Sequence, residues 1–291
     1  MTQVRANGLS FAVEDSGGSG PAVLLVMGLG MQLTAWPAEF LQPLAGAGYR
    51  LIRFDNRDIG LSSKLDHLGT PNLLWEGMKH RFGLPVRAPY RLQDMAADAL
   101  ALLDALGIAQ AHVVGASMGG MIAQRVALAA PQRVLSLTSI MSTSGARHLP
   151  GPRPQVMQAL LGRPRDRSEE AIVDHYVRLF QTIGSPGFPT PEPELRERVR
   201  QSVRRSYHPA GTARQMAAVA ADTSRAQELR RIAAPTLVLH GTADPLVPVA
   251  GGQDTARRIP GARFVTIPGM GHDFPPAAAG LLLEPLLPHL S

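Results

Sequence analysis

The amino-acid sequence predicts an α/β fold, in which a mostly parallel, eight-stranded sheet is flanked by helices. Short apolar runs alternate with helical segments along most of the chain, which is the pattern of a parallel sheet. One of these runs enters a helix through a Gly-x-Ser-x-Gly turn at residues 115–119. Near residue 142 the alternation gives way to a Pro- and Gly-rich segment followed by further helices, which predicts an inserted helical cap.

The sheet is expected to begin with two antiparallel strands and to continue with six parallel ones. The antiparallel pair covers residues 4–6 and 10–14. The parallel strands are predicted near Val23, Tyr49, His112, Val134, Thr236 and Arg263. An amphipathic helix over 92–106 precedes the strand at His112. Because parallel strands all end at the same edge of a sheet, the loops that follow them are expected to lie close together.

We expect two parts in the chain, a core made of residues 1–141 and 214–291 and a cap made of residues 142–213. In the cap, Ser168 is predicted to begin a helix, since a serine side chain can accept a hydrogen bond from a free N–H group of the first turn. A second, more polar helix is predicted over 192–206. An apolar stripe on the first helix is expected to pack the cap on the sheet, and it consists of Ile172, Tyr176, Leu179, Phe180 and Ile183.

The connection over residues 63–90 also lies outside the predicted core. It holds a cluster of large apolar side chains, and such a cluster in a long connection is expected to pack over a cleft or over the core. The cluster consists of Leu73, Leu74, Trp75, Met78 and Phe82.

Ser117 stands in the glycine-rich turn between the strand at His112 and the helix that follows. A serine hydroxyl is a poor nucleophile at neutral pH, so it needs a base to take its proton and N–H groups to meet the developing negative charge. The turn projects the hydroxyl into a cleft and places the positive end of the helix dipole beside it. The N–H of Met118, the next residue, is the first predicted donor. The pattern therefore predicts a nucleophile elbow.

The base and its orienting acid are expected in loops after two later strands. Asp244 follows the apolar run 235–240, and His272 follows the run 263–267 within a glycine-rich loop. An Asp before Pro245 is also a common turn former, but here its position agrees with the strand order. His112 and His240 lie within strands, where we expect packed core residues. The sequence therefore predicts a catalytic triad of Ser117, His272 and Asp244.

The second oxyanion donor is expected in the loop after the strand at Val23, and we assign it to the N–H of Leu29. The same loop contains Gly28-x-Gly30, and Asp55 ends the next strand, which imitates a dinucleotide-binding fingerprint. The third glycine of that fingerprint is replaced by Leu33. We therefore favour the oxyanion interpretation.

Together these motifs resemble the α/β-hydrolase-fold carboxylesterases, and among them the aclacinomycin methylesterase-like branch. The resemblance covers nearly the whole chain and is specific for the fold and the triad, and much less so for the substrate. Where relatives often have His-Gly, this chain has Met27-Gly28, which changes the polarity of the loop. The segments that carry the resemblance are 24–28, 36–40, 52–62, the elbow 115–119, 241–245 and 268–272.

The resemblance implies a serine carboxylic ester hydrolase that works through an acyl-enzyme on small-to-medium hydrophobic esters, with methyl esters and polyester or lactone-type substrates included. The same triad can also serve a cofactor-free perhydrolase or haloperoxidase, a lactonase or a carbon–carbon bond hydrolase. A small-molecule receptor without catalysis is the alternative outside enzymes. Neither a metal nor an organic cofactor is needed for this chemistry.

Composition limits the partners. The formal charge of +6 comes from scattered arginines without stacking aromatic side chains, so we do not expect nucleic-acid binding. The chain has no cysteine, and no run of it is long enough to span a bilayer. The first residues lack the apolar run of a secretory signal. We expect a cytoplasmic protein with a small hydrophobic ester as its partner, and leave open a homodimer and secretion after signal removal.

Overall fold

The computed structural model describes residues 1–291, apart from the side chain of Arg81. Eight strands form one sheet in the order β1-β2-β4-β3-β5-β6-β7-β8, which confirms the predicted fold class. The β1–β2 and β2–β4 pairs are antiparallel, and the remaining pairs are parallel. The strands are β1 (Thr2–Ala6), β2 (Leu9–Asp15), β3 (Ala22–Val26), β4 (Arg50–Phe54), β5 (Ala111–Ala116), β6 (Val134–Ile140), β7 (Thr236–Gly241) and β8 (Arg263–Ile267).

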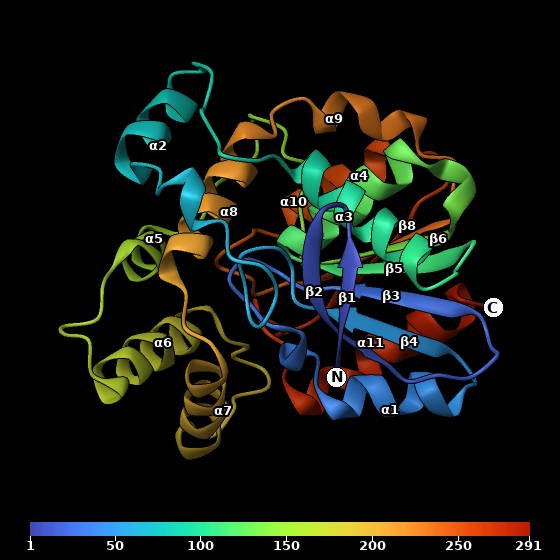
Figure 1. The fold of residues 1–291 in the computed structure, drawn as a ribbon, viewed down its shortest axis with the longest axis horizontal. Helices are drawn as coiled ribbons and strands as arrows, with labels where there is room; N and C mark the ends of the chain where they lie inside the picture. Colours follow the sequence, from blue (N-terminus) through green and yellow to red (C-terminus); the bar gives the residue numbers. More distant parts are fainter.

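Helices cover both faces of this sheet, as Figure 1 shows. The helices before the cap are α1 (Ala38–Gly46), α2 (Leu73–Arg81), α3 (Leu92–Ala105) and α4 (Met118–Ala129). Those between β6 and residue 221 are α5 (Pro154–Leu161), α6 (Glu169–Ile183), α7 (Glu192–Arg205) and α8 (Pro209–Ala221). The last three are α9 (Arg225–Glu228), α10 (Ala250–Arg258) and α11 (Ala279–Leu286). None of the helices in the described part of the chain is long and apolar enough to cross a bilayer.

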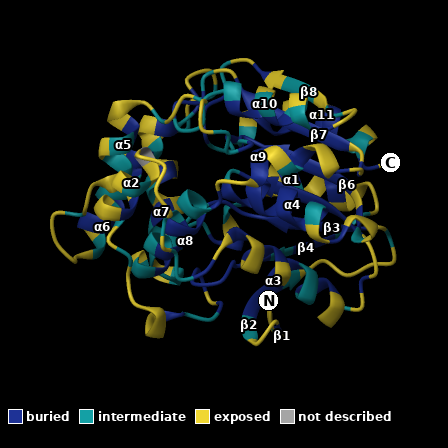
Figure 2. Cartoon of the chain, turned by 90° about the horizontal axis from the view of Figure 1, so that it is seen from above, coloured by how far each residue is buried: buried dark blue, intermediate teal, exposed yellow. Residues whose placement is uncertain are grey.

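The core has two layers because successive residues of a strand point to opposite faces of the sheet. Val113 of β5 packs with Leu102 of α3 and Ile122 of α4 on one face. The next residue, Val114, packs with Phe40 of α1 on the other face, where α11 also lies. In Figure 2 the central strands are accordingly coloured as buried. β3, β5 and β7 are buried along their whole length, as their mainly apolar sequences predict.

The strand order reverses between β3 and β5. The chain passes from β3 to β4 on one side and then crosses to β5 on the other side. In open α/β sheets the crevice outside such a reversal, at the carboxyl ends of the strands, is the usual ligand site. The loop after β3 and the loop after β5 both leave the sheet here, so Leu29 and Ser117 are brought to the same place.

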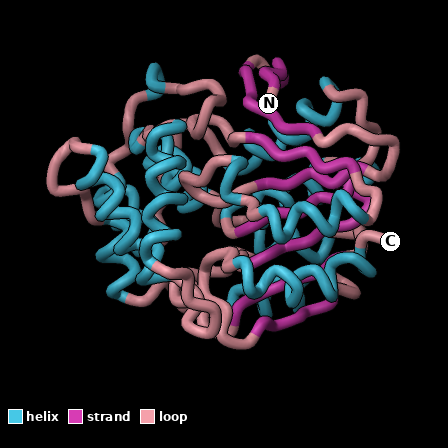
Figure 3. Tube along the Cα trace, turned by 90° about the horizontal axis from the view of Figure 1, so that it is seen from below, coloured by secondary structure: helices cyan, strands magenta, loops and turns pink.

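Helices α5, α6 and α7 lie beside the carboxyl edge as a group separate from the sheet (Figures 1 and 3). The predicted start of α6 is confirmed, because Ser168 is its N-cap residue and Ser168 Oγ accepts a hydrogen bond from the N–H of Ala171 at 3.3 Å. Val173 and Val177 of α6 pack on Leu195 and Val199 of α7 in a small core of their own. Helix α8 runs from residue 209 to 221, so the expected boundary at residue 214 falls inside a helix.

One packing expectation is wrong, and a second is confirmed in part. The apolar stripe of α6 does not pack on the sheet but mainly on α5 and α7. The apolar cluster in residues 63–90 does not join the core, but Leu73 and Leu74 line the cavity described below, which was the other expected position. Helix α2 instead lies against α8, where His80 Nδ1 is 3.0 Å from Ala220 O, and most of its apolar side chains are exposed, Leu74 at 75% and Trp75 at 55%.

Candidate active site

Ser117 lies between β5 and α4 in a strained backbone conformation, with φ 56° and ψ −121°. A positive φ is unfavourable for a residue with a side chain, so the surroundings must hold it in place. The N–H of Ser117 donates to Ile140 O at 2.9 Å, and its carbonyl accepts a hydrogen bond from Ser142 Oγ at 2.7 Å. Gly119 is needed here, because a Cβ atom on it would lie 1.9 Å from Val26 O. The elbow is thus locked against β3 and β6.

The structure brings the three predicted triad residues together. His272 Nε2 lies 2.9 Å from Ser117 Oγ, and His272 Nδ1 lies 2.7 Å from Asp244 Oδ2. Asp244 accepts two more hydrogen bonds through Oδ1, from the N–H groups of Leu246 at 2.9 Å and Val247 at 2.8 Å. Because an ionised carboxylate only accepts, Nδ1 carries the proton of a neutral His272, and its Nε2 is free to accept the serine proton.

The carboxyl of Asp244 stays ionised although its side chain is fully buried. Burial by itself raises the pKa of a carboxyl group, because it disfavours the charged form. Here the charge of His272 in its protonated form and hydrogen bonds from His240 and His272 outweigh burial and hold the pKa of Asp244 well below its usual range. Asp244 can therefore orient the imidazole and stabilise its protonated form.

His240 was expected to be a packed core residue, and it is fully buried, but its ring also reaches the acid. Its Nε2 lies 2.8 Å from Val247 O and 3.5 Å from Asp244 Oδ2. Its Nδ1 lacks a hydrogen-bond partner among the described residues. The signal that could have revealed this contact is the spacing of four residues between a histidine at a strand end and the acid in the following turn.

The loop after β3 lies directly against the nucleophile. A Cβ atom on Gly28 would be 3.1 Å from Ser117 Cβ and 3.6 Å from its Oγ, so Gly28 lies close to the nucleophile and has little room for a side chain. Within the described residues, the N–H of Leu29 has no hydrogen-bond partner. Met118 is the first residue of α4, where the N–H precedes the hydrogen-bond ladder of the helix. Leu29 thus lies in the loop whose Gly28 is close to Ser117, and Met118 follows Ser117 directly in the chain.

The contacts of Asp55 do not fit a dinucleotide site. Its carboxylate is fully buried and accepts hydrogen bonds from the N–H groups of Leu33 at 2.7 Å and Leu61 at 2.8 Å. A carboxylate that is enclosed and engaged in this way cannot reach a ribose hydroxyl. Asp55 instead ties the loop after β3 to the turn after β4.

A cavity of about 2080 Å³ lies between the carboxyl edge of the sheet and the helices of the cap region. Ser117 and His272 form part of its floor, and the apolar stripe of α6 supplies Phe180 to its wall. Polar groups also line it, among them Arg198 of α7 and Asp273. Burial raises the pKa of Asp273, although Ser185 donates a hydrogen bond to it.

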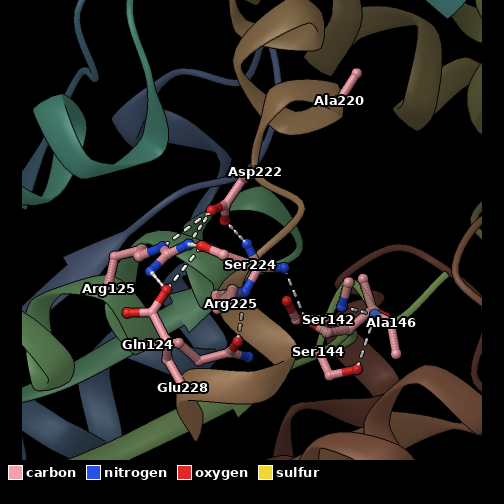
Figure 4. Close-up of polar contacts among 12 residues, drawn as sticks. Gln124, Arg125, Ser142, Ser144, Ala146, Ala220, Asp222, Ser224, Arg225 and Glu228 are labelled. Carbon is pink, nitrogen blue, oxygen red and sulfur yellow. Dashed lines mark hydrogen bonds and ion pairs between the residues drawn. The ribbon is translucent and has the colours of Figure 1, made fainter. Parts of the chain in front are cut away.

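Helix α4 is also held by a buried network of charged side chains, shown in Figure 4. Arg125 of α4 pairs with Asp222, and it also pairs with Glu228 at 2.9 Å. Arg225 pairs with Asp222 and donates to Gln124 Oε1 of α4 at 2.8 Å. The network joins the helix that carries the elbow to the segment after α8. Asp222 is therefore engaged away from the triad.

A family model described as the alpha/beta hydrolase fold matches residues 21–275. Rhodomycin D methylesterase DauP of Streptomyces sp. strain C5 is 33% identical to the chain, over 92% of this chain and 90% of that protein. A 2-hydroxy-6-oxononadienedioate/2-hydroxy-6-oxononatrienedioate hydrolase of Cupriavidus pinatubonensis is 27% identical over 89% of this chain and 82% of that protein. Among solved structures, a hydrolase from Pseudomonas aeruginosa PA01 superposes with a TM-score of 0.69 at 28% identity, covering 98% of this chain and 97% of the other.

Proposed function

We propose that this chain, which belongs to the alpha/beta hydrolase fold family and to its methylesterase-like branch, is a serine carboxylic ester hydrolase. The observation that carries the proposal is the continuous set of contacts from Ser117 Oγ through His272 to Asp244, with Ser117 and His272 in the floor of a cavity. Hydroxyl, imidazole and carboxylate in this order provide a nucleophile, its base and the group that orients the base.

The proposed reaction has two steps. His272 Nε2 takes the proton of Ser117 Oγ while the oxygen attacks the ester carbonyl, and it then gives that proton to the departing alcohol. Water next attacks the acyl-enzyme, His272 takes its proton, and Ser117 leaves with that proton as the acid is released. Met118 and Leu29 donate their N–H groups to the oxyanion in both tetrahedral states, and a donor of this kind contributes about 10²-fold or more to the rate.

The cavity supports esters with at least one bulky hydrophobic part. A volume of about 2080 Å³ exceeds the common range for small-ligand sites, and its apolar wall favours uncharged groups. The relative from Streptomyces is a rhodomycin D methylesterase, so methyl esters of large acids are the first substrates to test. We further propose that residues 142–213 form a cap that selects the substrate, because α6 and α7 supply side chains to the cavity wall while the triad comes from the core.

A burst experiment with an activated aryl ester tests the reaction type. An acyl-enzyme predicts one equivalent of alcohol released rapidly, then slower steady turnover, and both phases should vanish in Ser117→Ala. Steady turnover that survives in Ser117→Ala would contradict the proposal. Binding of the ester without any burst would favour the receptor alternative.

A substrate panel then separates the remaining chemistries. Methyl esters of bulky acids, short-chain aryl esters, lactones and polyesters test the ester classes. A peracid assay with hydrogen peroxide tests perhydrolysis, and a 2-hydroxy-6-oxo-dienoate tests carbon–carbon cleavage. We expect the highest kcat/KM on a methyl ester of a bulky acid. Faster cleavage of the dienoate than of every ester would move the assignment to a carbon–carbon bond hydrolase.

A further inference from the structure

Helix α8 is fixed on the turn that follows β4 through two adjacent side chains. Arg214 donates to both carboxylate oxygens of Asp58, at 2.8 and 2.7 Å, and both side chains are fully buried. Gln215, the next residue, is also fully buried and donates from Nε2 to Arg57 O at 3.0 Å. Arg57 is itself held by a buried ion pair with Asp98. The position of Gln215 is therefore well determined.

The other half of the Gln215 amide holds the loop after β3. Its Oε1 accepts a hydrogen bond from the N–H of Gly30 at 2.9 Å. Thr212, one turn earlier on α8, lies close to the same glycine, because a Cβ atom on Gly30 would be 3.1 Å from the Thr212 side chain. The peptide that joins Leu29 to Gly30 is thus held against α8 by a hydrogen bond to Gln215 and by the close approach of Thr212.

The N–H of Leu29 lies between this held peptide and Gly28, on which a Cβ atom would be only 3.1 Å from Ser117 Cβ. We propose that Gln215 is a positioning residue, which fixes the Leu29–Gly30 peptide and so aims the Leu29 N–H at the oxyanion. The inference rests on the proposed esterase function and adds to it a residue that touches neither substrate nor triad.

The loop needs such a support because it is rich in glycine. Gly28 and Gly30 leave its backbone free to adopt several conformations, and an oxyanion donor is effective only when it is held in place before the reaction. Asn56 Nδ2 donates to Met27 O at 2.9 Å and Asp55 holds Leu33 N–H, so these bonds fix the two ends of the loop. Within the described residues, Gln215 is the one side chain that bonds the peptide groups of its centre.

The test compares Gln215→Leu with the parent protein in two measurements. The first is kcat/KM for an activated ester. The second is the inhibition constant of a trifluoromethyl ketone, which forms a tetrahedral oxyanion on Ser117. Because a small displacement of a catalytic group can cost up to about a hundredfold, we expect kcat/KM to fall about tenfold to a hundredfold and the inhibition constant to rise by the same factor. The dissociation constant of the matching unreactive alcohol should stay unchanged.

Two further variants separate positioning from general stability. Gln215→Glu keeps an acceptor for the Gly30 N–H, so it should lose at least about threefold less activity than Gln215→Leu. Ser136→Ala removes a buried hydrogen bond to His112 at 2.8 Å near the opposite edge of the sheet. It should lower the melting temperature without changing either constant, with all assays run well below every melting temperature.

Equal kcat/KM in Gln215→Leu and the parent would overturn the inference, and so would a loss that leaves the ketone inhibition constant unchanged. A loss as large in Gln215→Glu as in Gln215→Leu would also contradict it. These outcomes leave the proposed function intact as long as Ser117→Ala is inactive. If Ser117→Ala keeps its activity, the proposed function itself fails.

Discussion

Nη1 of Arg205, in α7, lies 2.8 Å from Oδ2 of Asp55. The carboxylate of Asp55 is fully buried and also holds the loop after β3. This ion pair links the helices beside the cavity to the core. Arg205→Met should keep the aliphatic part of the side chain but lose the link, so that α6 and α7 exchange amide hydrogens faster and KM for a bulky ester rises. Hydrogen exchange read by mass spectrometry, together with steady-state kinetics, measures both effects.

Arg204→Met is the matched control for this prediction. Arg204 neighbours Arg205 on α7, but its ion pair is with Glu169 of α6 at 2.9 Å, so the pair stays within the cap region. Its side chain is 63% exposed, and a surface pair of this kind contributes little to stability. Equal changes in the two variants would show that the link to Asp55 does not hold the helices.

Asp244→Asn should lose far more activity than Asp273→Asn or Asp222→Asn. An amide at 244 favours the wrong tautomer of His272, and a change of this kind in a triad costs about 10⁴-fold in kcat. Asp273 adjoins His272 in the chain but bonds to Ser185, and Asp222 lies in the network around α4. Steady-state kinetics of the three variants decide the matter, since similar losses would mean that the acid is assigned wrongly.

The stability of the protein should fall as the pH drops below about 6.5, the ordinary value for histidine. Burial, together with the charge of His289, lowers the pKa of His112 in the folded protein. A group whose pKa is lower in the folded than in the unfolded protein contributes its full stabilisation of the fold above the unfolded pKa. This contribution is lost as the pH falls through the pKa of the folded protein.

The variant His112→Phe isolates this contribution. It removes the titrating ring and leaves a side chain of similar size next to Tyr49. Urea midpoints at pH 7.5 and pH 5 should differ less in the variant than in the parent. An unchanged difference between the two midpoints would place the acid sensitivity in other groups.

The triad residues could be predicted because each depends on a local pattern, a strand that ends in a loop of defined composition. Ser117, Asp244 and His272 therefore needed only the strand order to be brought together. Gln215 and Arg205 could not be found in this way. Their partners, Gly30 and Asp55, lie 185 and 150 positions earlier in the chain, and no local sequence pattern predicts such distant pairs. The exposure of Leu74 was missed for a related reason. Apolar composition predicts burial, but whether a long connection lies on the core depends on its contacts with distant parts of the chain, here with α8.

The elbow should tolerate no side chain at position 119. Gly119→Ala would place a Cβ atom 1.9 Å from Val26 O, and both partners are backbone, so β3 and α4 would have to separate. Because Ser117 precedes α4 and the Leu29 loop follows β3, this separation would displace both. We expect loss of activity with a clear loss of stability. Gly280→Ala is the control, since a Cβ atom there meets nothing within 4 Å and the residue lies inside α11. An alanine within a helix is favoured over glycine by about 0.8–1.0 kcal/mol, so this variant should be slightly more stable and fully active. Thermal melts and ester kinetics on both variants measure the contrast, and an active, stable Gly119→Ala protein would show that the close approach of α4 to β3 is not required.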